Sequence, residues 1–183
     1  MFRNHTQAVW LGLLFASALF GCSSATAPTR FYLLSDPTQS SYTEAACGVR
    51  LAGTSVAPYL QRTHIMIQSG TNELVPAMQH RWSEPLEAGV SRLLARCLNS
   101  SGDSASSVRV QIDHLHGNTN GDVVLQARWS LKGQGPTNLI AATEQQFSAS
   151  LPQPVAGYDA LVSTQRALVL ELCTNIKAAV PSC

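Results

Sequence analysis

The pattern of apolar and polar residues predicts short strands at the start of the chain's folded part. Apolar runs bounded by turn residues are expected to form strands at 30–34, at 48–56 and around residues 65–67 and 74–75. Between the second and third of these, residues 58–60 are expected to form a turn or a short helical piece. This part of the chain is therefore expected to be rich in strands.

Two later segments have a helical period. Ser83 can cap the first helix, with Glu84 and Pro85 in its opening turn, and the polar run 99–107 ends it. The second helix is expected from about Tyr158 to Ala179, with Gln165 as the one polar residue in its apolar stripe. The two apolar stripes consist of Leu86, Val90, Leu93, Leu94 and Cys97, and of Leu161, Leu168, Leu172 and Ile176.

Between the two helices the period changes to two. Apolar and polar residues alternate in 108–113 and again in 123–132, and a glycine- and asparagine-rich turn at 117–121 separates the two segments. A further turn at 133–136 leads to a third strand through 139–147. One face of such strands is buried, and the other is wet or meets a partner.

The order of elements predicts a single α+β domain without internal repeats. Its sheet is expected to be mainly antiparallel or mixed, with two helices packed on one face.

The N-terminus predicts a signal peptide over residues 1–21. Residues 1–7 carry one positive charge and no acid, and residues 8–21 carry no charge. That apolar segment would span about 21 Å as a helix, which is short of the roughly 30 Å of a bilayer core. A charged start, an apolar middle and small residues at the end are typical of export rather than of a membrane span.

The segment Leu-Phe-Gly-Cys at 19–22 resembles the lipobox of bacterial lipoproteins, although Phe20 is bulkier than usual. The resemblance implies that Cys22 becomes the first mature residue and carries acyl and diacylglyceryl groups, palmitate among them. Ser23, in place of aspartate, then favours sorting to the outer membrane of a Gram-negative bacterium. The alternative is a soluble secreted protein in which Cys22 is incidental.

Residues 22–29 are small and polar, and we expect a flexible tether there. Residues 23–29 reach at most about 25 Å, so the domain at 30–183 would stay close to its membrane, on the periplasmic face. Two acyl chains suffice for stable anchoring.

The charge balance excludes some classes of partner. Arg3 is the only charged residue of the predicted signal peptide, so the remaining chain has equal numbers of basic and acidic side chains. Such a balance offers no electrostatic basis for binding nucleic acid or an anionic membrane surface. The chain is 45% hydrophobic and only 13% charged, which is compatible with a permanent partner or with a homo-oligomer.

Four cysteines besides Cys22 are candidates for disulfides in an oxidising periplasm. They are Cys47, Cys97, Cys173 and Cys183, and their spacing leaves the pairing open. Cys97 and Cys173 lie late in the two predicted helices, where they could equally be core residues. Their spacing does not indicate zinc.

Motifs for catalysis are missing from the sequence. It contains no GxSxG or SxxK segment, no dinucleotide-binding loop and no Walker-type sequence, so we expect no enzyme and no cofactor beyond the lipid anchor. His114 and His116 have a spacing that a metal could use. We interpret them as polar residues where a strand enters a turn, and we predict no metal site.

His80, Arg81 and Trp82 are the candidate partner-binding residues. They place a titratable group, a cation and an aromatic ring just before a predicted helix, and tryptophan and arginine are common anchors at interfaces. The alternative is that Trp82 closes the core at the entrance to the helix. Trp129, on its alternating strand, is expected to be a core residue.

The most distinctive short segment is HRWSEPL at 80–86, which follows Asn-Glu-Leu at 72–74. Together with the leucine-rich helix after it and segments at 31–34, 49–60, 121–131 and 158–162, it resembles the ABC-type transport auxiliary lipoproteins of the paraquat-inducible protein C (PqiC) type. The resemblance extends over most of the chain after residue 30.

This resemblance implies a function in lipid transport between the inner and outer membranes. Members of the family accompany MCE-domain proteins and inner-membrane transport components, and PqiC-like members are outer-membrane lipoproteins that dock the periplasmic assembly. We therefore expect a non-enzymatic auxiliary component. The alternatives are a periplasmic carrier that holds an acyl chain between sheet and helices, and, less favoured, a periplasmic hydrolase.

Overall fold

The structure is a computed structural model that describes residues 27–34, 49–98, 106–133, 139–150 and 157–180. The predicted signal peptide, the predicted lipid-attachment residue Cys22, the sorting residue Ser23, and Cys47 and Cys183 all lie outside the described residues.

The described chain alternates strands and helices in the predicted order. The strands are β1 (Arg30–Tyr32), β2 (Val49–Val56), β3 (His64–Gln68), β4 (Leu74–Trp82), β5 (Ser106–Asn118), β6 (Asp122–Lys132) and β7 (Leu139–Ser150). The helices are the short 3₁₀ helix η2 (Pro58–Gln61), α2 (Leu86–Cys97) and α3 (Gly157–Ala178).

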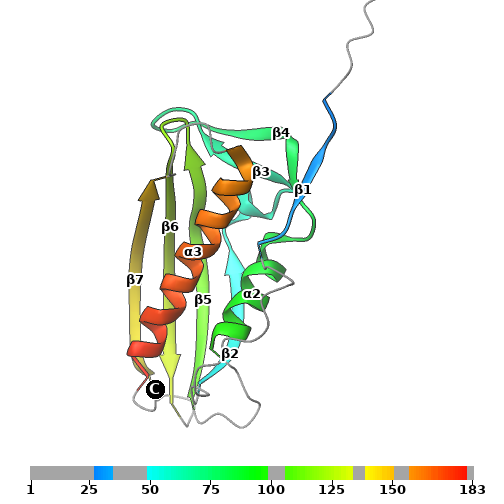
Figure 1. The fold of residues 1–183 in the computed structure, drawn as a ribbon. Coiled ribbons are helices and arrows are strands. Elements are labelled where there is room, and N and C mark those ends of the chain that lie inside the picture. The colour runs from blue at the N-terminus through cyan, green and yellow to red at the C-terminus, as the bar shows by residue number, and fades with distance from the viewer. Residues whose placement is uncertain (1–26, 35–48, 99–105, 134–138, 151–156, 181–183) are drawn as a thin grey trace, which may run out of the picture.

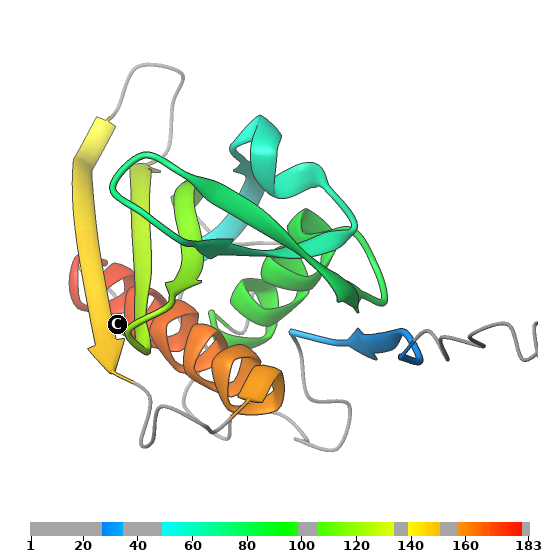
Figure 2. The ribbon, with the colours of Figure 1, turned by 90° about the horizontal axis from the view of Figure 1, so that it is seen from above.

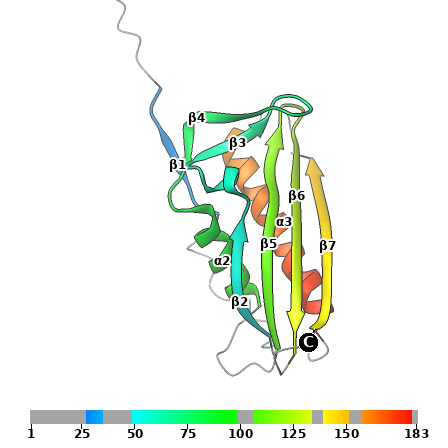
Figure 3. The same cartoon turned by 180° about the vertical axis from the view of Figure 1, so that it is seen from behind.

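All seven strands belong to one mixed sheet, with β5 at its centre. The order is β1-β4-β3-β5-β6-β7, and β2 also pairs with β5. One edge of β5 pairs antiparallel with β6. Two strands share its other edge: β2 pairs in parallel with residues 106–112, and β3 pairs in parallel with residues 117–118. Figure 3 shows β2 and β3 in succession along this edge.

Helices α2 and α3 cover the same face of the sheet (Figures 1 and 2), so the predicted α+β class with two helices on one face is confirmed. The alternating apolar residues of β5 and β6 point toward them, and Val108, Val110 and Ile112 are completely buried. The apolar stripes predicted for the two helices are buried as well.

The start of α2 differs from the prediction. Helix α2 begins at Leu86, and Pro85 occupies the N-cap position without a side-chain hydrogen bond, so Ser83 is not the cap and Glu84 precedes the helix. The reason is tertiary: the Ser83 amide donates to the carbonyl of Tyr32 at 2.8 Å, which keeps β4 and the residues after it extended beside β1. Glu84 instead forms an ion pair with Arg92 at 2.6 Å.

Strands β4, β5 and β7 are also longer than predicted. Strand β4 extends through Trp82, β5 runs from Ser106 to Asn118, and β7 extends to Ser150. The hairpin between β5 and β6 turns at the predicted place. There Asn118 Oδ1 accepts the amide hydrogens of Asn120 and Asp122, and Gly121 has a φ of 90°, a value that favours glycine.

Candidate interaction surfaces

The three residues His80, Arg81 and Trp82 end strand β4 and have different surroundings. Trp82 is only 7% exposed and belongs to the core, as in the alternative interpretation of this residue. Arg81 pairs in register with Phe31 of β1 and is partly exposed. His80 faces the helix side, where it contacts two aromatic residues.

His80 joins three elements that lie far apart in the sequence. Its Nδ1 is 2.8 Å from the hydroxyl of Tyr32 in β1, and its ring stacks on Tyr158 in the first turn of α3, with centroids 3.6 Å apart. Burial, and next the nearby charge of Arg30, lower the pKa of His80. The aromatic cluster of Tyr32, His80 and Tyr158 is therefore most stable with a neutral imidazole.

A second contact holds the residues that follow β1. The Nε of Arg166, in the middle of α3, donates to the backbone carbonyl of Leu34 at 2.6 Å, and Leu34 is 1% exposed. Nothing in the sequence around Arg166 or Tyr158 indicated contacts with residues more than 120 positions earlier. Together with the aromatic cluster, Arg166 fastens the first described strand to the body of the domain.

Large apolar side chains are exposed on β1, just after it, and on the neighbouring strand β4. Among the described residues these are Phe31 at 64%, Leu33 at 39% and Met78 at 62% exposure, and we call them the tether-side patch. Phe31 and Leu33 belong to the segment that directly follows the predicted tether. Met78 lies on β4, two residues before the His80 that pairs with Arg30 of β1.

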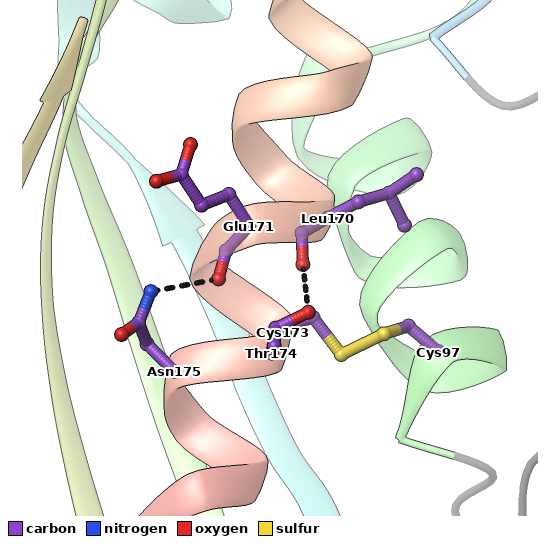
Figure 4. The surroundings of a disulfide bond; sticks show 6 residues. All are labelled: Cys97, Leu170, Glu171, Cys173, Thr174 and Asn175. Carbon is purple, nitrogen blue, oxygen red and sulfur yellow. Dashed lines mark hydrogen bonds between the residues drawn. A yellow bond between two sulfur atoms is a disulfide. The ribbon is translucent and has the colours of Figure 1, made fainter.

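The two helices are joined by a disulfide between Cys97 of α2 and Cys173 of α3 (Figure 4). Their Cα atoms are 6.5 Å apart, and both residues are buried. Of the four candidate cysteines, these two are therefore brought together, and the other two lie outside the described residues.

The face of the sheet turned away from α2 and α3, here called the outer face, is polar. The strands β2, β5, β6 and β7 all contribute charged or hydroxyl side chains to it, because residues next to buried ones point to the opposite side. Its cations are Arg50, Arg109, Arg128 and Lys132, and its acids are Asp113, Asp122 and Glu144.

The acids of the outer face all have bonding partners. Arg128 binds Asp113 through two hydrogen bonds of 2.7 and 2.8 Å, and these bonds are the main cause of the lowered pKa of Asp113. Asp122 accepts hydrogen bonds from Asn118 and Ser150, which lower its pKa. The amide of Gln126 donates to the Glu144 carboxylate.

Two open hollows lie on the outer face. One, of about 450 Å³, includes Gln111, Arg128 and Glu144 in its lining, and the other, of about 320 Å³, includes Ala52, Ser107 and Lys132. Arg109 and Ser130 line both. Neither of these two hollows opens between the sheet and the helices, where a carrier would hold an acyl chain. A third hollow, of about 530 Å³, lies between β2, η2 and the start of α2, and its lining includes Val56, Gln61 and Leu86.

Among the described residues, no third potential ligand joins His114 and His116 in a metal site. The rings meet edge to face with centroids 5.7 Å apart, His116 is 6% exposed, and His114 Nδ1 lies 3.1 Å from the hydroxyl of Tyr59. Burial lowers the pKa of His116 and raises that of Tyr59 to about 12. No cluster of three potential metal ligands occurs in the ranges that the structure describes.

Within the described part of the chain, neither helix has both the length and the apolar character needed to cross a bilayer.

Comparisons with known proteins identify relatives over nearly the whole described chain. The model of the family described as ABC-type transport auxiliary lipoprotein component matches residues 32–177. The intermembrane transport lipoprotein PqiC of Escherichia coli (strain K12) is 25% identical over 167 residues, which cover 84% of this chain and 87% of the relative. PqiC of Shigella flexneri gives the same values.

Solved structures share the fold. A crystal structure of an uncharacterized protein superposes with a TM-score of 0.66 at 19% identity, covering 82% of this chain and 97% of the other. A protein of Xanthomonas campestris superposes with a TM-score of 0.61 at 11% identity, covering 81% and 90% of the two chains. At these identities the similarity concerns the fold alone.

Proposed function

Because the chain belongs to the ABC-type transport auxiliary lipoprotein component family, we propose that it is an outer-membrane-anchored periplasmic lipoprotein that docks an MCE-type intermembrane lipid transport system. It would act without catalysis, as an auxiliary component linked to inner-membrane ABC components. The observation that carries the proposal is the family match over residues 32–177, which runs from β1 to the last turn of α3.

The position of the tether-side patch supports anchoring at this end. Two of its side chains, Phe31 and Leu33, follow directly on the tether that would begin at the acylated Cys22. A tether of this length reaches at most about 25–30 Å. The bilayer could therefore cover apolar side chains that would otherwise stay in water, at about 25 cal/mol for each Å² buried.

The contacts behind the patch support a mechanical role. A component that links a membrane to a periplasmic assembly carries tension from its tether to its folded domain. The aromatic cluster and the Arg166–Leu34 hydrogen bond connect the first strand to β4 and to α3, and the disulfide connects α3 to α2. Tension on the tether would thus reach the core rather than peel off β1.

The polar outer face is the surface that we assign to the partner. Of the three residues first considered for this role, Trp82 is buried, His80 is engaged within the domain, and only Arg81 remains as a partly exposed candidate. The outer face, in contrast, spans four strands and is covered by neither helix (Figure 3).

Metabolic labelling tests the anchor. Cells grown with radiolabelled palmitate should yield a labelled protein in the outer-membrane fraction of a sucrose gradient. Cys22→Ala should abolish the label, Cys47→Ala should retain it, and Ser23→Asp should shift the protein toward the inner membrane. A wild-type protein without label, or one recovered from the soluble periplasm, would rule out the anchor.

Co-purification tests the docking role. An MCE-domain protein should be recovered with the tagged lipoprotein from detergent-extracted envelopes, and deletion of the lipoprotein should weaken the envelope barrier. The role would be refuted if the purified MCE-domain protein and the soluble domain did not associate and the deletion left envelope integrity unchanged.

A further inference from the structure

We infer that one end of the outer face docks an acidic, extended segment of a protein partner. This end, here called the basic end, consists of Arg50, Arg109 and Lys132 together with Ser107 and Ser130. The inference rests on the proposed function and deepens it, since it gives the chemistry by which the partner is recognised.

The pairing register gathers these residues from three strands. Arg50 of β2 lies opposite Ser107 of β5, and Ser107 lies opposite Lys132 of β6. Two residues farther along β5, Arg109 lies opposite Ser130. The result is a set of three cations with two hydroxyl groups between them, on the side of the sheet that faces away from the helices.

No carboxylate of the described residues compensates these cations. The outer-face acids lie farther along the sheet, where Asp113 is bound to Arg128, and Asp122 and Glu144 are held by other polar side chains. Arg50, Arg109 and Lys132 have no ion pair within the ranges that the structure describes. The basic end thus keeps a positive potential that an anionic partner can meet.

The shape of the surface at the basic end suits an extended polypeptide rather than an enclosed small molecule. The two hollows share Arg109 and Ser130 in their linings, so they lie next to each other on neighbouring strands, one reaching Lys132 and the other Glu144. Both hollows are open to solvent. Serine hydroxyls in the floor can donate hydrogen bonds to carboxylates between the cationic side chains.

The position of the basic end favours a protein partner over the headgroups of the anchoring bilayer. Figure 3 shows the start of β2 and the end of β6 at one end of the sheet, whereas β1 lies toward the other end. The 13 residues of β5 span about 40 Å. Because charges are screened beyond about 8 Å at physiological salt, headgroups of a membrane at the tether end are too distant to attract the basic end.

Peptide binding tests the inference. The probe is a fluorescein-labelled decapeptide of alternating glutamate and serine, and the protein is the full mature chain with Cys22→Ser, measured by fluorescence anisotropy at 20 and 150 mM NaCl. The double variant Arg109→Glu with Lys132→Glu should weaken binding at least tenfold. The matched control, Arg62→Glu with Arg96→Glu, changes the net charge equally at exposed sites elsewhere and should bind within twofold of the parent.

Three results would overturn the inference: no binding of the acidic peptide at 20 mM salt, an equal loss in the two double variants, or binding of phosphatidylglycerol vesicles through Arg109 and Lys132 without peptide binding. Circular dichroism checks the folding of each variant. If the glutamate variant does not fold, Arg109→Gln with Lys132→Gln should weaken peptide binding at least threefold, and an unchanged affinity would count against the inference. Because the measurement uses an unacylated chain, a negative result would count against the docking of an acidic segment and would leave the proposed lipid anchor untouched.

Discussion

The imidazole of His80 is stacked on the ring of Tyr158, with centroids 3.6 Å and planes 16° apart, although the two residues are 78 positions apart in the chain. The same imidazole bonds to the Tyr32 hydroxyl. One titratable side chain thus connects the segment after the tether with the first turn of the last helix, and its environment makes stability depend on pH.

We expect the folded domain to lose stability as the pH falls below about 6.5. The pKa of His80 is lowered from 6.5 in the folded chain, so the unfolded chain binds more protons at this site. The contribution of the neutral imidazole to the stability of the folded domain is therefore complete above pH 6.5, and it is lost as the pH falls through the lowered pKa. Melting temperatures measured from pH 7.5 to 5.0 would show this decline.

His80→Gln should make that decline shallower. His116 also has a lowered pKa and contributes with the same sign, so His116→Gln serves as a second variant, and the double variant should flatten the profile further. If His80→Gln left the pH profile of the parent unchanged, the imidazole would not be the titrating group.

Arg166→Met should loosen the segment after β1. The change removes the hydrogen bond from the guanidinium to the Leu34 carbonyl and should lower the free energy of unfolding by about 1–2 kcal/mol. Amide hydrogen exchange in residues 31–34 should accelerate more than exchange in β5. Arg96→Met, on the exposed side of α2, is the matched control and should change neither quantity appreciably.

Removal of the disulfide should destabilise the domain by about 2–4 kcal/mol, because the link closes a long segment between Cys97 and Cys173, which are separated by 76 positions. Urea unfolding of Cys97→Ala with Cys173→Ala would measure the loss. The control variant, Cys47→Ser with Cys183→Ser, should retain a transition that shifts to lower urea on addition of dithiothreitol. A control variant insensitive to the reductant would contradict the helix-to-helix link.

Gln165→Met should raise the melting temperature or leave it unchanged. Gln165 is completely buried, its Nε2 lies 3.5 Å from the Leu115 carbonyl, and its Oε1 has no hydrogen-bond partner among the described residues. An apolar side chain of similar length removes that unpaired oxygen at the cost of one weak hydrogen bond. Gln165→Glu, which would bury a carboxylate, should lower the free energy of unfolding by about 2 kcal/mol or more. Thermal melts should therefore place Gln165→Glu well below the parent and Gln165→Met at or above it.

The elements themselves could be predicted because local periodicity reports burial directly. The alternation over residues 108–112 and 123–131 matches the buried face of β5 and β6, and the predicted helical stripes are the buried faces of α2 and α3. The beginning of α2 could not be predicted, because serine is a residue type that commonly caps helices and Ser83 lies at the right place. In the structure, the amide of Ser83 instead donates a hydrogen bond to the carbonyl of Tyr32.

The sequence by itself determined which residues are core, where the chain turns, the α+β class with its two helices, and the family to which the protein belongs. These follow from apolar periods and short motifs that lie within a few positions of one another. Only the tertiary structure decided which distant residues meet: His80 with Tyr158, Arg166 with Leu34, and Cys97 with Cys173. It also decided that Arg50 and Lys132 lie on either side of Ser107 in β5. The physical reason is that strand register and helix placement are set by burial of the whole core, and a one-residue slip of β2 or β6 would separate the cations of the basic end.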